Sequence, residues 1–226
     1  MKDLNILYED NHIIVVNKEA GVLVQGDSTG DEPLSDKVKA YIKKKYDKPG
    51  DVYLATIHRL DRPVSGVVLF ARTSKAADRL SKQFQDRSVK KTYWALVSNR
   101  PPEDEDTLIH WIKKDTEKNR VHCYESDRRG GQRAELSYKL LGKVGQYYLV
   151  QVNPKTGRPH QIRAQLAKIG CTINGDLKYK DKIKNRNGSI HLHARQLEFM
   201  HPTKKEPVRI TAKLPEDKFW QNFTQF

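Results

Sequence analysis

The chain has 226 residues, of which 37% are hydrophobic and 31% charged. These values are those of a globular protein with a sizeable core, and no segment reaches the apolar length of a membrane-spanning helix. No signal-peptide core follows the N-terminus, so we expect a cytoplasmic protein. The formal net charge of +14 favours a polyanionic partner such as nucleic acid, although a merely soluble basic protein would show it too.

Short apolar strands and two amphipathic helices alternate in the first half of the chain. An apolar run that stops at a glycine predicts a buried strand, and apolar residues along one face of a lysine-rich segment predict a helix. A Thr-Ser pair before the second helical pattern supplies an N-cap. The predicted elements are strands over His12–Lys18, Val67–Phe70 and Lys91–Val97, and helices over Pro33–Tyr46 and from Thr73 or Ser74 onward.

The second half of the chain consists mainly of predicted strands. The loop Arg100–Asp106, with two prolines and several acids, is the candidate boundary between two lobes. Many strands with few helices and no regular alternation predict an α+β fold with a mixed, largely antiparallel sheet. The predicted elements are strands over Leu108–Ile112, Arg120–Tyr124 and Val208–Leu214, a hairpin of Ala134–Leu141 with Tyr147–Val152 that turns at Gly142–Gly145, and a helix over His160–Ile169.

One carboxylate, Asp61, stands between Arg59 and Arg62, directly before a Ser-Gly turn and an apolar run. Neighbouring guanidinium groups favour the ionised form of a carboxylate. An ionised and positioned carboxylate can act as the nucleophile in covalent catalysis. The alternative is an exposed ion pair in a loop, which would contribute little to stability.

A second polar stretch precedes the last predicted helix. A Thr-Gly turn lies there, and the unpaired N–H groups and positive dipole of a helix start favour an anion. Arg158 and Arg163 add further donors. Arg163 falls at the edge of the buried helix face, where a guanidinium needs a carboxylate partner, and Asp61 is the obvious candidate. A phosphate clamp on the surface is the competing interpretation.

Two further features are weaker signals. Tyr93, within the strand predicted over Lys91–Val97, is by itself an ordinary packed aromatic residue. His191 and His193 suggest a metal site, but no carboxylate or cysteine stands beside them at ligand spacing. We therefore predict no metal there.

Five segments resemble, in the same order, motifs of the RluA-type RNA pseudouridine synthases. His58–Gly66 resembles the family's H-R-L-D-x-x-[TV]-S-G motif, and Thr156–Arg163 is similar to its T-G-R-x-H-Q-I-R segment. Five motifs in order are far more specific than any one of them. The remaining similar segments are Lys91–Ala95 (K-x-Y-x-A), Gly175–Tyr179 (G-D-x-x-Y), and Leu192–Ala194 followed by His201–Pro202 (L-H-A…H-P).

The resemblance implies both a fold and a reaction. It implies a mixed β-sheet in two lobes flanked by helices, with an active-site cleft between the lobes. One catalytic domain would span residues 1–226, without the N-terminal S4 domain of many relatives. The reaction would be the isomerisation of uridine to pseudouridine in RNA, with no metal or organic cofactor. The base would leave the stack first, because an enzyme cannot reach its glycosidic bond within paired RNA.

The resemblance also assigns roles to single residues. Asp61 would be the catalytic nucleophile, Arg163 would pair with it, and Tyr93 would lie against the target uracil. Arg59 would help to hold the nucleotide in its flipped position. The other expected substrate contacts are Arg62, Arg158, His160 and Leu192.

Several alternatives stay open from sequence alone. Asp61 could add to C1′ or C6 of the nucleotide, or it could remove the 2′ proton. A non-catalytic RNA-binding or ribosome-assembly protein would use the same basic surface, whereas a retaining glycosidase would need a second carboxylate where the motif offers arginines. The RNA stem-loop could belong to rRNA, tRNA or both. We expect a monomer with no membrane partner.

Overall fold

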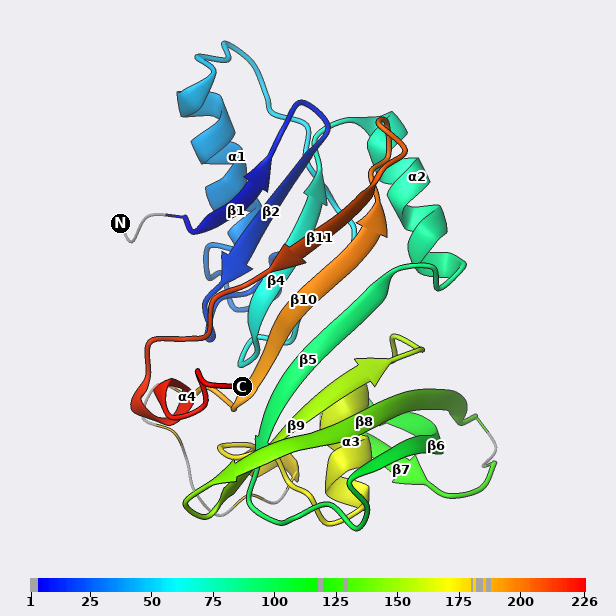
Figure 1. Ribbon diagram of the computed structural model, residues 1–226. Coiled ribbons are helices and arrows are strands. Elements are labelled where there is room, and N and C mark those ends of the chain that lie inside the picture. The colour runs from blue at the N-terminus through cyan, green and yellow to red at the C-terminus, as the bar shows by residue number, and fades with distance from the viewer. Residues whose placement is uncertain (1–3, 118–119, 128–129, 180, 182–184, 186–187) are drawn as a thin grey trace. The chain divides into compact units, whose positions relative to one another are not determined.

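The computed structural model describes residues 4–117, 120–127, 130–179, 181, 185 and 188–226. The chain folds as two compact units, whose helices and strands are labelled in Figure 1. The first unit runs through Lys90 and takes in Ala194–Lys213, and the second comprises Lys91–His193 and Leu214–Phe226. The loop predicted over Arg100–Asp106 lies inside the second unit.

The sheet of the first unit is formed by strands that lie far apart in the sequence: β1 (Ile6–Glu9), β2 (Ile13–Lys18), β3 (Ala55–Thr56), β4 (Ser65–Ala71), β10 (Leu192–Met200) and β11 (Pro207–Thr211). β2 pairs antiparallel with β1 and with β4, and β10 pairs antiparallel with β11. β4 and β10 are neighbours that point the same way in Figure 1. The sheet is therefore mixed and largely antiparallel, as predicted.

Two helices belong to this unit, α1 (Leu34–Lys45) and α2 (Ser74–Gln85). Thr73 caps α2 as predicted, since its hydroxyl accepts the N–H of Ala76 at 3.3 Å. The inward face of α2, with Leu80 fully buried, packs in one apolar core with Leu69 of β4. β4 is buried along its whole length, which explains its unbroken run of small and apolar residues.

The second unit contains an antiparallel meander that includes β5 (Lys90–Val97), β6 (Glu105–Asp115), β7 (Arg120–Tyr124), β8 (Gln132–Val144) and β9 (Tyr147–Pro154). β5 pairs antiparallel with β9, β9 with β8, β8 with β6 and β6 with β7. The hairpin of β8 and β9 is confirmed, but its turn comes later than expected. Gly142 lies inside β8, where a Cβ atom would come within 2.2 Å of the Phe226 ring.

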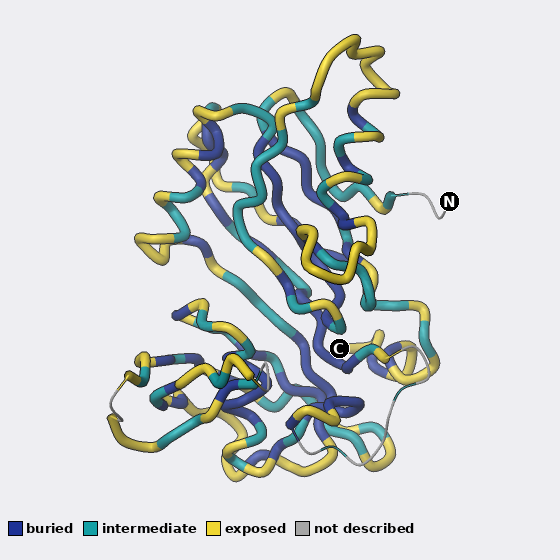
Figure 2. The backbone as a smooth tube through the Cα atoms, turned by 180° about the vertical axis from the view of Figure 1, so that it is seen from behind, coloured by how far each residue is buried: buried dark blue, intermediate teal, exposed yellow. Residues whose placement is uncertain are grey.

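Short helices complete the second unit: α3 (Gln161–Lys168), the 3-10 turn η1 (Leu177–Tyr179) and α4 (Lys218–Gln221). The sequence prediction missed β1, β3, η1, β10 and α4. α4 matters for packing, because Trp220 and the following Phe223 are each 1% exposed and join Trp94 in a core cluster. Figure 2 shows the buried stretches of the chain, such as β2 and β4, in dark blue. Among the described residues, no helix is long and apolar enough to cross a membrane.

Candidate active site

Asp61 lies at a tight turn that leads into β4. Its carbonyl oxygen accepts the N–H of Val64 at 3.0 Å. Leu60 and Val64 are 8% and 2% exposed, so an apolar side chain is anchored on each side of the half-buried carboxylate. The position of this carboxylate is thus set by core packing of its neighbours, which an exposed loop would not provide.

His58, the first residue of the same motif, attaches the segment to its surroundings. Its Nε2 accepts the N–H of Leu69 at 3.1 Å, and its ring stacks on Phe84 of α2 with centroids 5.1 Å apart. Nε2 therefore carries no proton in this bond. The histidine of the motif holds the chain that leads to Asp61 against β4 and α2.

Gly66 shows why the motif ends in glycine. Its φ is +118°, and a Cβ atom there would lie 2.3 Å from the carbonyl oxygen of Ala194. Only glycine allows this backbone conformation and this close approach. The end of the Asp61 motif therefore lies directly against the Leu192–Ala194 segment, which is another of the five motifs.

Lys18 is a residue of this site that the sequence interpretation missed. It is 1% exposed, and its Nζ donates to the carbonyl oxygens of Glu19, Val22 and Arg62 at 3.0, 2.7 and 3.2 Å. Burial lowers the pKa of Lys18 to about 7, although the nearby Asp61 carboxylate acts to raise it. A lysine directly after a fully buried strand and before a glycine turn is the signal that could have revealed it.

The two arginines beside Asp61 differ in their surroundings. Arg62 is exposed, and its Nε donates to the carbonyl oxygen of Gly21 at 3.0 Å while Nη2 lies 2.6 Å from Asp31. Its own carbonyl accepts the N–H of Gly21 at 2.7 Å. Arg62 thus stabilises the loop after β2. Arg59 is exposed as well. Their predicted contacts with substrate stay predictions.

Arg163 lies on α3 in the second unit and is buried, at 5% exposed. Its Nε and Nη2 donate to the two oxygens of Asp176 at 2.7 and 2.9 Å. The expectation that a buried guanidinium needs a carboxylate is confirmed, and Asp176 is a partner that we did not name. The pairing of Arg163 with Asp61, which belongs to the first unit, stays a prediction.

The turn before α3 is organised by its own side chains. Gln161 Oε1 accepts from the Thr156 hydroxyl at 2.7 Å and from the Arg158 N–H at 3.0 Å. Gln161 also donates through Nε2 to the carbonyl oxygen of Glu135 at 3.0 Å. The Arg158 N–H that we expected at an anion site is therefore already hydrogen-bonded to Gln161. Thr156 and Gln161 tie the motif to β8.

Tyr179 joins three parts of the second unit. Its hydroxyl lies 3.0 Å from His160 Nδ1 and accepts the N–H of Val121 at 3.0 Å. The guanidinium carbons of Arg163 and Arg120 lie 5.2 and 5.3 Å from its ring centre, within cation–π range. The final tyrosine of the G-D-x-x-Y segment therefore supports Arg163 together with Asp176.

Comparisons with known proteins agree with this arrangement. The model of the RNA pseudouridylate synthase family matches residues 12–168. This chain belongs to that family. A curated "tRNA pseudouridine synthase C" from Vibrio cholerae serotype O1 is 34% identical over 96% of this chain and 93% of its own length. A "Ribosomal large subunit pseudouridine synthase C" from Vibrio vulnificus is 32% identical over 96% of this chain and 67% of its own length.

A solved structure supports the fold assignment. "Human RNA Pseudouridylate Synthase Domain Containing 4" is 26% identical, with a TM-score of 0.77, and the match covers 94% of this chain and 89% of that one. The resemblance inferred from the five motifs is confirmed, and the protein is an RNA pseudouridine synthase, an isomerase. RNA is therefore its substrate class.

The other predicted residues of the synthase lie in the second unit. Tyr93 is half-buried on β5 opposite Val152 of β9, and Leu192 is 3% exposed at the start of β10. His160 takes a left-handed backbone with φ 51° just before α3. Their roles toward substrate stay predictions.

His191 and His193 pack against Trp220, and no group of metal-ligating side chains lies among the described residues.

Proposed function

We propose that this synthase converts uridine to pseudouridine in tRNA, with Asp61 as the nucleophile. The length of the match favours tRNA over rRNA. Five relatives named for tRNA match over 90–96% of their own length, whereas a sixth matches over 62% and two ribosomal relatives match over 67% and 65%. The length of the match thus agrees with most of the relatives named for tRNA.

The fixed position of Asp61 is the observation that carries the assignment of the nucleophile. Its turn is held by buried neighbours on both sides, and Lys18 and Arg62 close the loop beside it. A carboxylate that is placed by packing can act on one atom of a bound substrate.

The reaction breaks the N1–C1′ bond of the uridine, turns the base and joins C5 to C1′. N1 ends with a proton and C5 loses one, so the product is an isomer and no oxidant or reductant is consumed. Addition of Asp61 to the nucleotide and removal of the 2′ proton by Asp61 both require its carboxylate to be ionised. We propose that Arg163, oriented by Asp176, pairs with it during the reaction.

The base must be reached before this chemistry begins. Flipping costs a few kcal/mol and costs least where the base is already unpaired, so a loop uridine is the preferred target. We propose that Tyr93 offers its ring to the flipped uracil, a contact worth about 1–3 kcal/mol. Arg59 would help to hold the displaced nucleotide in its flipped position. The cytoplasmic location and the monomeric state stay predictions.

The choice of RNA is tested by mapping pseudouridine in RNA from cells that lack the gene. Purified protein is added to the tRNA fraction and to large-subunit rRNA from these cells. We expect one or more uridines of tRNA to be converted and rRNA to be unchanged. Conversion in rRNA alone would contradict the tRNA assignment, although it would leave the family activity intact.

The role of Asp61 is tested by Asp61→Asn, which keeps the size of the side chain and removes its charge. We expect pseudouridine formation to be lost while tRNA binding is retained. Asp51→Asn is the matched control, because Asp51 is an exposed carboxylate of the same unit. Full turnover by Asp61→Asn would refute the assignment.

A further inference from the structure

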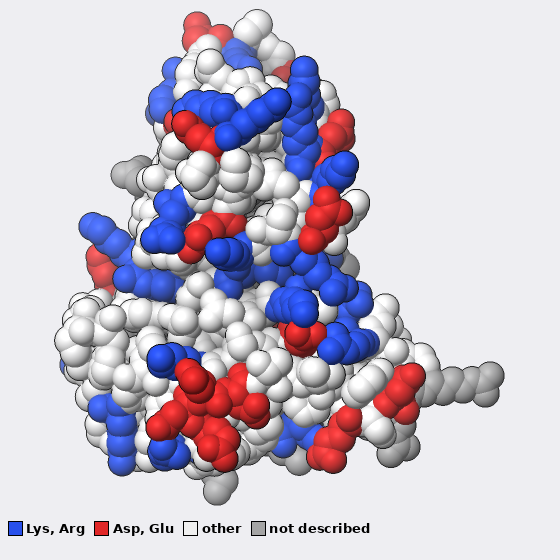
Figure 3. Space-filling model, turned by 45° about the vertical axis from the view of Figure 1, so that its right-hand side comes forward, with Lys and Arg blue, Asp and Glu red and all other residues white. Residues whose placement is uncertain are grey.

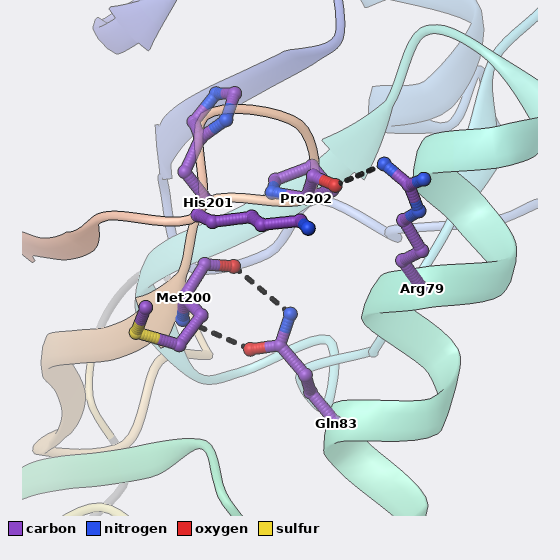
Figure 4. A pocket seen from close by; sticks show the side chains of 6 residues that line it. Arg79, Gln83, Met200, His201 and Pro202 are labelled. Atoms are coloured by element: carbon purple, nitrogen blue, oxygen red, sulfur yellow. Dashed lines mark hydrogen bonds between the residues drawn. The ribbon is translucent and has the colours of Figure 1, made fainter.

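A pocket of about 350 Å³ opens in the first unit where α2 meets the end of β10 (Figure 4). The pocket is formed by side chains of α2 and of the turn that joins β10 to β11. Two of them, Arg79 and Lys205, are cationic. The lining residues are Arg79, Gln83, Met200, His201, Pro202 and Lys205.

Hydrogen bonds between α2 and the strand end fix the wall of this pocket. Gln83 donates to the carbonyl oxygen of Met200 and accepts its N–H, both at 2.9 Å. Arg79 Nη1 donates to the carbonyl oxygen of Pro202 at 2.6 Å. Figure 4 shows these three hydrogen bonds. A carbonyl holds the guanidinium in place but leaves its charge uncompensated, so Arg79 is a pre-oriented cation.

The turn after β10 is held just as firmly. His201 Nε2 lies 2.8 Å from Asp10 Oδ2, and its Nδ1 accepts the N–H of Lys204 at 3.0 Å. Lys205 follows in a left-handed conformation with φ 57°. This conformation is unfavourable for a side chain such as lysine and is often found where function requires it. The turn therefore fixes the backbone from which Lys205 extends.

The cations of this corner lack acidic partners. Arg79 and Lys205 form no ion pair with the part of the chain that the structure describes, and the same holds for Lys75 and Lys82 on α2. All four residues are exposed. Lys75 and Lys82 lie about 10 Å apart along the helix at 1.5 Å per residue. Figure 3, in which the right-hand side of Figure 1 comes forward, shows many Lys and Arg side chains on this face, with Asp and Glu side chains between them.

We propose that Lys75, Arg79, Lys82 and Lys205 form a phosphate-binding surface for the RNA backbone, which we name the α2 corner. The proposal rests on the proposed function, because it takes the substrate RNA as the ligand. Asp78 also lies on α2, but the four cations form no ion pair with it in the described structure. Cations at and beside a hollow that are not ion-paired match the regular negative charge of RNA phosphates. Guanidinium and ammonium groups are the side chains that commonly contact them.

The α2 corner and the Asp61 motif meet the first unit at different places. His58 of the motif stacks on Phe84 near the end of α2, whereas Lys205 lies beyond the far end of β10. Gly66, at the start of β4, lies against Ala194, and β10 then runs six residues on to Met200. Six residues of strand span about 20 Å. Lys205 therefore contacts RNA that is remote from the target uridine. The α2 corner adds more affinity for a large folded RNA than for a short stem-loop.

The test compares charge-reversal variants in two regions of the same unit. Lys82→Glu/Lys205→Glu changes the α2 corner, and Lys43→Glu/Lys44→Glu changes two exposed lysines of α1 by the same net charge. The dissociation constant is measured for full-length tRNA and for a stem-loop that carries the target uridine, over a range of salt concentrations. Pseudouridine formation is measured at saturating tRNA in parallel.

We expect the α2-corner variant to weaken tRNA binding about tenfold or more and to lower the salt slope by about one for each lost phosphate contact. Stem-loop affinity should fall less than tRNA affinity, and turnover at saturating tRNA should not change. Equal losses in both variants, an unchanged tRNA affinity, or an equal loss for the stem-loop would each overturn the proposal.

A second variant separates this role from folding. Lys205→Gly removes the charge and also relieves the left-handed backbone strain. It should therefore melt at the same or a higher temperature while binding tRNA more weakly, and unchanged binding would count against the α2 corner. If the wild-type protein modifies no RNA, the proposed function fails by itself. The binding comparison still decides the α2 corner in that case.

Discussion

Arg163 and Asp176 form a buried ion pair with two parallel hydrogen bonds. Nε lies 2.7 Å from Oδ2 and Nη2 lies 2.9 Å from Oδ1, and the two side chains are 6% and 2% exposed. Because a planar guanidinium held by two parallel hydrogen bonds cannot rotate, Asp176 fixes the orientation of the Arg163 side chain. The residue that we propose to pair with the nucleophile is thus oriented from its own unit.

Removal of Asp176 tests this relationship. Asp176→Ala leaves a buried, uncompensated guanidinium, so we expect the free energy of unfolding to fall by about 3–5 kcal/mol. Urea denaturation measures the change. Arg163→Met/Asp176→Leu removes both charges and should recover much of the lost stability without recovering pseudouridine formation. A double variant no more stable than Asp176→Ala would show that the unpaired charge was not the cause.

Gly66→Ala is expected to destabilise the first unit severely. The new Cβ would lie 2.3 Å from the Ala194 carbonyl oxygen, on a backbone with φ +118°. We expect a loss above about 4 kcal/mol, or no folded protein, in thermal melts. Gly50→Ala is the control, because no atom lies within 4 Å of its added Cβ. Its effect should stay within about 1 kcal/mol.

Lys18 should make stability depend on pH in the alkaline range. Burial lowers its pKa from 10.5 to about 7 in the folded protein. Between these values the unfolded chain binds a proton that the folded chain does not, so the free energy of unfolding rises with pH. Lys18→Met should lose this rise. Denaturant titrations from pH 7 to 10 measure the difference between the two proteins, and a constant difference would contradict the shift.

Asp10 should contribute to stability at neutral pH and lose that contribution in acid. Burial acts to raise its pKa, but hydrogen bonds from the His12 and Ile13 N–H groups and from His201 and Tyr8 outweigh it and lower the pKa below 3.8. A lowered carboxyl pKa stabilises the folded state above the unfolded value, and the effect disappears as pH falls through the folded value.

The measurement for Asp10 is acid unfolding of Asp10→Asn beside the wild-type protein. The stability difference between them should be largest near neutral pH and shrink below about pH 4. Asp78→Asn, which alters an exposed carboxylate on α2, should behave like the wild-type protein. If the difference in stability between Asp10→Asn and the wild-type protein stayed the same in acid, the lowered pKa of Asp10 would be refuted.

Local sequence patterns predicted most of the fold. The cap at Thr73, the helix face with Leu80 inward, the hairpin of β8 and β9, and the buried strand β4 follow from spacing and side-chain chemistry within a few residues. The missed elements lacked such signals. β3 has two residues and α4 has four, so each is stable only because the rest of the unit packs against it.

The sequence by itself determined the family, the RNA substrate class and the Asp61 motif, because these depend on the identity and order of residues. Tertiary structure alone decided which groups support one another. Asp176 beneath Arg163, Lys18 under the carbonyl of Arg62, and Ala194 against Gly66 are each separated by at least ten residues in sequence. No local period encodes such contacts, since they arise only when distant strands pair and exclude water from the groups between them.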